Sequence, residues 1–313
     1  MSRHDDGRTV RDDGEPSAGR VVRGGIGTAW LDWGGEGQPL VLLHPNGFCA
    51  GVYDPLARRL ADRYRVVGVD LRGHGDSDDV VDEALLGNDA MALDVLAAAD
   101  ALGVGRFAVV GVSFGAAVGV EVAAAAPERV AALVLCEAIA IEAAAQEEQN
   151  FGFEGGENPL AAGALRRRDV WNDRAAAEAS YASRPPLNEL HSAALAGYVR
   201  WGFRDREDGM VELSCRPKTE ALIFGSRSRH GPAQTFEALR RVAADGRVPM
   251  AVMAGSRTHL DASWFSAQAE VAGVDLQLVD GGHFCLFEDL DRADRLLDGI
   301  LEELLGPRIE EES

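Results

Sequence analysis

The chain of 313 residues has few of the sequence features that mark metal-binding, disulfide-rich, nucleic-acid-binding or secreted proteins. Its four cysteines are scattered, without the spacing of a zinc site or a disulfide framework. Its formal charge of −20 disfavours nucleic acid and anionic membrane surfaces as partners. The opening residues contain no apolar run of the kind found in a secretory signal. We therefore expect a cytoplasmic protein that binds no metal, with a solvated, disordered tail over residues 1–19.

The apolar stretch "AVVGVSFGAAVGVEVAAAA" (residues 108–126) is not typical of a membrane span. It contains Glu121 and many Gly and Ala residues, and it ends at Pro127. It divides better into a short buried strand, a glycine turn and a helix of small residues. Ser113 then lies at the bend between the strand and the helix.

Apolar runs alternate with helical patterns through most of the chain, and 46% of its residues are hydrophobic. This alternation predicts an α/β protein whose mostly parallel central sheet has helices on both faces. Ligands of such sheets bind beyond the carboxyl ends of the strands. We expect one core domain formed by residues 20–138 and 216–313. Its strands are expected at 28–33, 39–43, 65–70, 107–112, 129–136, 248–255 and 273–282, and helices at 54–63, 88–102, 292–305 and from residue 114 onward.

Residues 139–215 interrupt this alternation with a helical, irregular and aromatic-rich pattern. The segment lies between two strands of the core, which predicts an inserted helical cap, or lid. Trp171, Tyr198 and Trp201 are its candidate substrate-binding residues. The alternative is that these aromatic side chains form the small core of the cap itself.

"GVSFG" (residues 111–115) matches the pattern G-x-S-x-G between a strand and a helix. A nucleophilic serine on such a turn has a strained backbone, and its small neighbours let the strand and the helix pass closely. The alternative is an ordinary tight turn with an idle serine. The flanking "FAVV" and "AAVGVEVAAAA" favour the nucleophile.

At this point the chain resembles the α/β-hydrolase family, from Thr28 to Leu305. Three further blocks appear in the expected order: "LLHPNGF" resembles the oxyanion loop of the family, "VDLRGHGDSD" the segment after the next strand, and "GGHF" the histidine turn.

The resemblance implies that Ser113 is the nucleophile and His283 its base. It also implies an oxyanion hole of two backbone N–H groups, from Phe114 and from Gly47 or, alternatively, Phe48. We expect structural roles for the charged residues that follow Val69, including Asp70 and Arg72.

The acid of the triad departs from the usual family pattern. The family usually places an Asp three residues after the glycine that closes the seventh strand, but here Gly255 leads to Thr258. Glu137 follows the sixth strand, where zearalenone-type lactonases and some haloalkane dehalogenases carry their acid. A carboxylate at the end of a buried strand is costly without a partner, which favours Glu137. Asp261 remains the alternative.

A serine nucleophile forms an acyl-enzyme. The expected function is therefore hydrolysis of a carboxylic ester or lactone of a hydrophobic small molecule by a Ser-His-Glu triad. Two alternatives remain open: a C–C bond hydrolase acting on a β-diketone, and a non-catalytic small-molecule receptor of the same fold. No cofactor is expected, because the glycine-rich residues 24–37 lack the spacing of a dinucleotide fingerprint. The sequence is compatible with a homo-oligomer.

Overall fold

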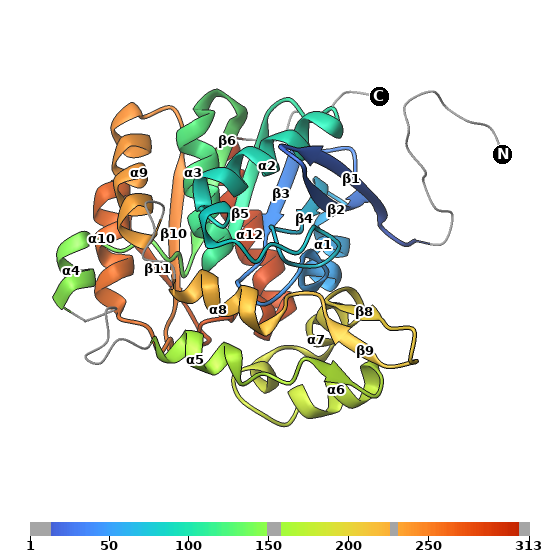
Figure 1. Cartoon of the computed structure of the whole chain (residues 1–313). Coiled ribbons are helices and arrows are strands. Elements are labelled where there is room, and N and C mark those ends of the chain that lie inside the picture. The colour runs from blue at the N-terminus through green and yellow to red at the C-terminus, as the bar shows by residue number, and fades with distance from the viewer. Residues whose placement is uncertain (1–13, 149–157, 226–230, 307–313) are drawn as a thin grey trace.

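The centre of the molecule is an eight-stranded sheet with the order β1-β2-β4-β3-β5-β6-β10-β11 (Figure 1). The computed structural model describes residues 14–148, 158–225 and 231–306. β1 and β4 each pair with β2 in antiparallel fashion, and all other neighbouring strands of this sheet are parallel. The predicted mostly parallel sheet is thus confirmed. Its strands are β1 Ser17–Arg23, β2 Ile26–Gly34, β3 Pro39–Leu43, β4 Arg65–Val69, β5 Phe107–Val112, β6 Val130–Cys136, β10 Met250–Gly255 and β11 Leu276–Val279.

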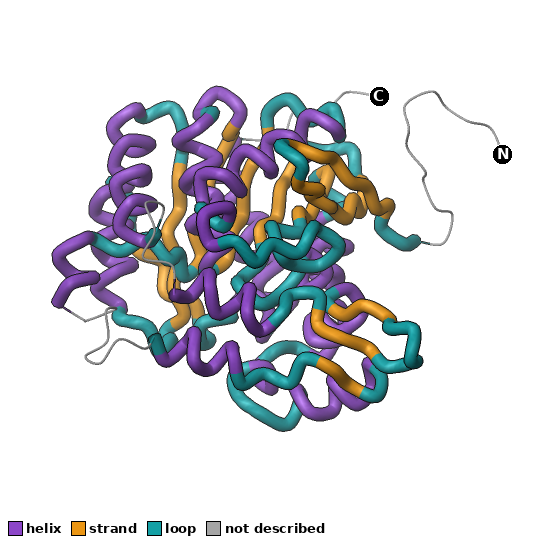
Figure 2. Tube along the Cα trace, in the orientation of Figure 1, coloured by secondary structure: helices purple, strands orange, loops and turns teal. Residues whose placement is uncertain are grey.

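Helices cover both faces of this sheet, as the alternating pattern predicts (Figure 2). α2, α3, α9 and α10 pack on one another on one face, whereas α1 and α12 pack together on the other. The helices of the two layers are α1 Asp54–Leu60, α2 Asn88–Ala101, α3 Phe114–Ala125, α9 Pro232–Asp245, α10 Ala262–Ala272 and α12 Leu290–Leu305. The short helix α11, Cys285–Glu288, precedes α12.

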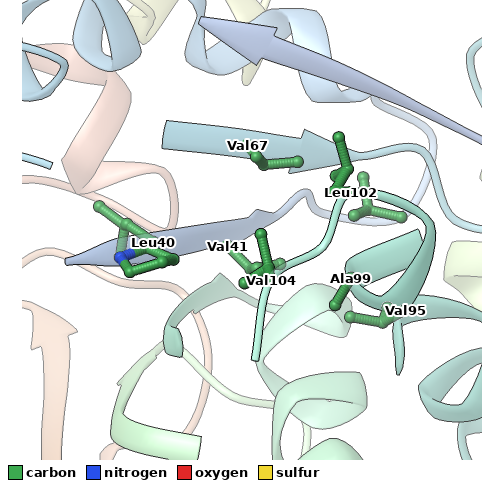
Figure 3. A pocket seen from close by; sticks show the side chains of 9 residues that line it. Leu40, Val41, Val67, Val95, Ala99, Leu102 and Val104 are labelled. Carbon is green, nitrogen blue, oxygen red and sulfur yellow. The ribbon is translucent and has the colours of Figure 1, made fainter. Parts of the chain in front are cut away.

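The central strands are apolar on both faces because each face meets a helical layer. In β3, Leu40 and Leu42 belong to one hydrophobic cluster, and Val41 and Leu43 belong to the other. This is the alternation of side chains expected for an extended strand. Figure 3 shows apolar side chains of β3 and β4 facing those of α2. Ser113 is not among the residues that line this gap, which is therefore distinct from the site described below.

The first strand differs from the sequence expectation. Ser17–Gly19, which we expected to belong to the tail, are part of β1 and pair with β2 in the register Ser17↔Asp32. β1 alternates half-buried and exposed side chains because it is the edge strand of the sheet. Such an edge strand buries too little apolar surface to give the continuous apolar run by which the inner strands are recognised. Residues 14–16 of the expected tail form no helix or strand, and residues 1–13 lie outside the described residues.

The segment between β6 and β10 contains a second, three-stranded sheet with the order β7-β9-β8. Its other described elements are helices, and α8 packs on α5. Figure 1 shows β8, β9 and α5–α8 grouped beyond one end of the large sheet. The cap is expected at residues 139–215, with the core resuming at residue 216. Because α8 packs on α5, we include α8 and call residues 158–225 the insertion. Its elements are α5 Pro159–Leu165, β7 Val170–Trp171, α6 Arg174–Tyr181, α7 Ser192–Trp201, β8 Phe203–Asp205, β9 Val211–Leu213 and α8 Pro217–Gly225, and α4 Ala143–Glu148 precedes it.

The apolar stretch at residues 108–126 forms the buried strand β5 and the helix α3. This confirms the predicted strand–turn–helix. Across the ranges that the structure describes, every helix is either too short or too polar to cross a lipid bilayer.

Two glycines allow α3 to lie against the sheet. A Cβ atom at Gly111 would lie 2.4 Å from the Cα of Ala116, and one at Gly115 would lie 2.2 Å from the carbonyl oxygen of Leu43. Real side chains do not tolerate such distances to backbone atoms. The spacing of G-x-S-x-G therefore reflects the close approach of α3 to β5 and to the end of β3.

We expect Gly115→Ala to lower the free energy of unfolding by about 1–3 kcal/mol, because the added methyl group must push Leu43 or α3 aside. The measurement is chemical denaturation. The matched control is Gly163→Ala in α5, where the new Cβ has open space and Ala favours the helix. Equal stability of G115A and the wild type would contradict the close-packing argument.

Candidate active site

Ser113 occupies the sharp turn between β5 and α3. Its φ of 57° and ψ of −118° are strained for a residue with a side chain. In the described part of the chain, only Ser113 and Glu137 combine a side chain with positive φ. Backbone strain of this kind concentrates at functional sites, where surrounding contacts maintain it. Here the N–H of Ser113 donates to the carbonyl of Cys136, so the turn is tied to the end of β6.

His283 lies within hydrogen-bonding distance of Ser113. Its Nε2 is 3.0 Å from the Oγ of Ser113, although 170 residues separate the two in the chain. The ring lies in the loop between β11 and α11, and its side chain is 11% exposed. This geometry suits transfer of a proton from the serine hydroxyl to the imidazole.

Glu137 completes a continuous chain of hydrogen bonds. Its Oε2 is 2.9 Å from the Nδ1 of His283, and its side chain has no solvent exposure. The same carboxylate accepts from the N–H of Gly255 through Oε1, at 2.6 Å, and from the hydroxyl of Thr258 through Oε2, at 2.7 Å. The donors compensate for burial of the charge and orient it toward the imidazole.

The two candidate acids therefore lie in different settings. Asp261, the alternative, is the N-cap of α10 and accepts from the N–H of Ser263 at 2.8 Å. Thr258, which stands where the usual Asp of the family was expected, donates to Glu137. In the sequence, Thr258 marks only the absence of the usual acid. Its position three residues after Gly255 was the signal that the residue faces the site.

The expected oxyanion donor Gly47 is already engaged. Its N–H donates to the Nε2 of His74 at 3.0 Å, and the N–H of Phe48 donates to the carbonyl of Pro45 at 3.2 Å. This corrects the sequence expectation for both residues. Histidine partners for loop amides are set by tertiary contacts, so the order of residues in "HPNGF" did not reveal them.

The N–H groups of Asn46 and Phe114 remain available. Within residues 14–148, 158–225 and 231–306, neither group donates to an acceptor. Both residues are buried, at 7% exposure each, and Phe114 begins α3 directly after Ser113. The positive end of the helix dipole reinforces the donor at Phe114.

Two neutral histidines support residues 44–48, which we call the oxyanion loop. The Nδ1 of His44 donates to the carbonyl of Pro45, and that of His74 donates to the carbonyl of Arg72. Their Nε2 atoms accept from the N–H groups of Leu71 and Gly47. Burial lowers the pKa of His74 to about 4 and lowers that of His44 well below its usual value. Both rings are therefore uncharged acceptors at neutral pH.

The charged residues after β4 tie loops together, which confirms their predicted structural role. Asp70 accepts from the N–H groups of Ala50 and Asp76, and Arg72 forms a buried ion pair with Asp94 of α2. Among the described residues, no group of His, Cys, Asp and Glu side chains is arranged to hold a metal ion.

The three aromatic candidates of the insertion have different neighbours. Trp171 packs edge-on against Tyr181 and donates to the carbonyl of Arg168. Trp201 covers Gly51, where a Cβ would lie 2.3 Å from the indole. Tyr198 contacts the oxyanion loop itself, because its hydroxyl donates to the carbonyl of Gly47 at 2.9 Å. The role of these residues in binding substrate stays a prediction.

Comparison with known proteins identifies the family. A model of the alpha/beta hydrolase fold matches residues 38–290. Pimeloyl-[acyl-carrier protein] methyl ester esterase of Nitrosomonas europaea is 43% identical over 101 residues, 32% of this chain and 37% of that protein. The dihydrolipoyllysine-residue acetyltransferase component of the acetoin cleaving system of Pseudomonas putida is 32% identical over 146 residues, 46% of this chain and 38% of that protein. The matches span little more than a third of these curated relatives.

Solved structures of similar fold cover almost the whole chain. E-2-(acetamidomethylene)succinate hydrolase superposes with a TM-score of 0.72 at 20% identity, over 92% of this chain and 99% of that one. The thioesterase domain from the curacin biosynthetic pathway gives a TM-score of 0.70 at 21% identity, over 91% and 99% of the two chains. At this level of identity the likeness establishes the fold.

The depressed pKa of His74 predicts a loss of stability in acid. Between pH 6.5 and about 4 the unfolded state binds a proton at His74 that the folded state does not, so stability falls as pH falls. We expect the unfolding free energy of the wild type to drop more steeply than that of His74→Gln, with a difference in slope that approaches about 1.4 kcal/mol per pH unit below pH 6.5. Denaturant unfolding at pH 7, 6 and 5 measures both slopes, and parallel slopes would contradict a neutral, buried His74.

Proposed function

Because the chain belongs to the α/β hydrolase fold family, we propose that it is a serine hydrolase that cleaves a carboxylic ester or lactone of a hydrophobic small molecule. The observation that carries this proposal is the unbroken chain of hydrogen bonds from Ser113 through His283 to Glu137. A serine hydroxyl becomes an effective nucleophile only when a positioned base accepts its proton. The proposal assigns the three residues the roles of nucleophile, base and acid.

In the proposed reaction, the Oγ of Ser113 attacks the carbonyl carbon while the Nε2 of His283 takes its proton. Glu137 holds the Nδ1 proton and stabilises the imidazolium that forms. Collapse of the tetrahedral intermediate expels the alcohol, which takes the proton from His283, and leaves an acyl-enzyme. Water then attacks the acyl group with His283 again acting as base, and the carboxylic acid is released.

We assign the oxyanion hole to the N–H groups of Phe114 and Asn46. The carbonyl of Pro45 accepts from the ring of His44. Since the C=O and N–H of a trans peptide point in opposite directions, this contact orients the N–H of Asn46 away from His44. The free donor at Asn46 and the one at the start of α3 supply the two groups that a developing oxyanion requires.

The chemistry of a serine nucleophile and the name of one relative both favour an ester or lactone as substrate. A serine nucleophile requires an acyl group with a leaving group, and esters and lactones provide an alkoxide. The relative from Nitrosomonas europaea is named as a methyl ester esterase. The net charge of −20 also disfavours a strongly anionic substrate, because the protein's field would repel it. These points support a neutral, hydrophobic ester as the first class to test.

A panel of p-nitrophenyl esters, lactones and β-diketones tests the proposal. We expect turnover of the esters or lactones and stoichiometric labelling of Ser113 by a fluorophosphonate, detected by mass spectrometry. Ser113→Ala is the control and should show neither. Turnover confined to β-diketones would favour the C–C hydrolase. Saturable ligand binding without turnover or labelling would favour the receptor.

The triad acid is tested by a matched pair of amide variants. Glu137→Gln presents an NH₂ group or a neutral oxygen to His283 and disturbs its tautomer, so we expect kcat to fall by about 10³–10⁴-fold. Asp261→Asn preserves the N-cap of α10 and should keep kcat within about twofold of the wild type. Steady-state kinetics on the ester with the highest kcat/KM measure kcat for both variants and the wild type. A large loss in D261N together with an active E137Q would reverse the assignment.

A further inference from the structure

The oxyanion loop is held from two sides. At the core side, the ring of His44, the first residue of the loop, donates to the carbonyl of Pro45, and His74 accepts from the N–H of Gly47. These contacts orient the first two peptide groups of the loop after Pro45. The third peptide group joins Gly47 to Phe48. Its carbonyl accepts from Tyr198, which belongs to α7 of the insertion and not to the core.

The direction of the Gly47 carbonyl depends strongly on such a contact. Its φ is +79°, in the left-handed region, and glycine has more conformational freedom than any other residue. The residue directly follows Asn46, whose N–H we assign to the oxyanion hole. The N–H of the same peptide group, from Phe48, donates to the carbonyl of Pro45, and the Nη1 of Arg167 lies 3.5 Å from the Gly47 carbonyl. Tyr198 adds the shortest contact to that carbonyl, at 2.9 Å, and so defines the direction of the neighbouring N–H.

Tyr198 is itself fixed within the insertion. It is 1% exposed, and burial raises the pKa of its hydroxyl well above its usual value, so the hydroxyl keeps the proton that it donates. The Nη2 of Arg167 donates to this hydroxyl at 2.7 Å. The ring of Tyr198 also lies on Phe48, with centroids 4.8 Å apart. The hydroxyl thus accepts from Arg167 and donates to Gly47.

A further set of contacts connects Arg167 back to the oxyanion loop through Glu220. Arg167 forms an ion pair with Glu220 at the start of α8. The backbone carbonyl of Glu220 accepts from the side-chain amide of Asn46 at 3.1 Å. Glu220 therefore contacts the residue that we assign to the oxyanion hole, and Arg167 links Glu220 to Tyr198.

We propose that Tyr198, held by Arg167, is a positioning residue that fixes the oxyanion loop through the carbonyl of Gly47. The inference rests on the proposed function and deepens it. Its consequence is that the insertion contributes to the rate of the chemical step, not only to recognition of the substrate. In this proposal Tyr198 acts through the loop and not on the reacting atoms, and the test below separates this role from substrate binding.

The discriminating variant is Tyr198→Phe, which removes one hydroxyl and keeps the ring. We expect kcat on the fastest p-nitrophenyl ester to fall by about tenfold while KM stays within about twofold, because the lost contact matters most when the oxyanion forms. Affinity for an alkyl trifluoromethyl ketone, whose hemiketal oxyanion mimics the intermediate, should fall by the same factor. Affinity for the product carboxylic acid should not change.

Tyr181→Phe is the matched control. The hydroxyl of Tyr181 also bonds Arg167, at 3.2 Å, but Tyr181 is not bonded to the oxyanion loop, so kcat should stay within about twofold. A second variant, Arg167→Lys, keeps the charge beside Glu220 but loses the planar guanidinium that reaches Glu220 through Nη1 and Tyr198 through Nη2 at the same time. It should lower kcat in the same sense and leave KM unchanged, and it provides the test if Y198F does not fold.

The outcomes separate this inference from the proposed function. If the wild type hydrolyses esters and forms the ketone adduct, but Y198F matches it in kcat and ketone affinity, the inference is overturned and the proposed function stands. An effect of Y198F on KM alone would assign Tyr198 to substrate binding and would also overturn the inference. If the wild type neither turns over esters nor labels at Ser113, the proposed function fails and the inference fails with it.

Discussion

Burial of the Glu137 carboxylate is the constraint on which the rest of the site depends. A charge without solvent exposure is stable only if surrounding donors replace the lost water. The N–H of Gly255, the hydroxyl of Thr258 and the ring of His283 provide those donors. They come from the end of β10, the loop after it and the loop after β11. One buried charge thus determines how three separate segments meet.

The order of strands in the sheet explains how these segments come together. β5, β6, β10 and β11 are parallel neighbours, so the loops that follow them emerge at the same edge. Ser113, Glu137, Thr258 and His283 each lie in the loop or turn just after one of these strands. The order of the strands, and not proximity in the chain, brings the hydroxyl, imidazole and carboxylate within hydrogen-bonding distance. The positive φ of Ser113 and Glu137 is maintained by this network.

A second network of neutral groups supports the oxyanion loop. On the core side of the loop, His44 and His74 act as uncharged acceptors in a buried setting. The pKa values of both rings lie below their usual value, so the loop keeps its contacts at neutral pH. Tyr198 adds a contact from the insertion. The loop is therefore enclosed by groups from both parts of the fold.

The sequence alone predicted the inner strands and the turn at Ser113, because burial on both faces and close backbone approach leave local patterns of apolar residues and glycines. The resemblance to the α/β-hydrolase family predicted the histidine turn at His283. The sequence also indicated Glu137, since a carboxylate directly after a buried strand requires a partner. Only the tertiary structure decided that Thr258 donates to that carboxylate, that Gly47 is engaged by His74, and that Ser17 begins an edge strand. These outcomes depend on which segments far apart in the chain become neighbours, and no local pattern records the partner of a single N–H or hydroxyl group.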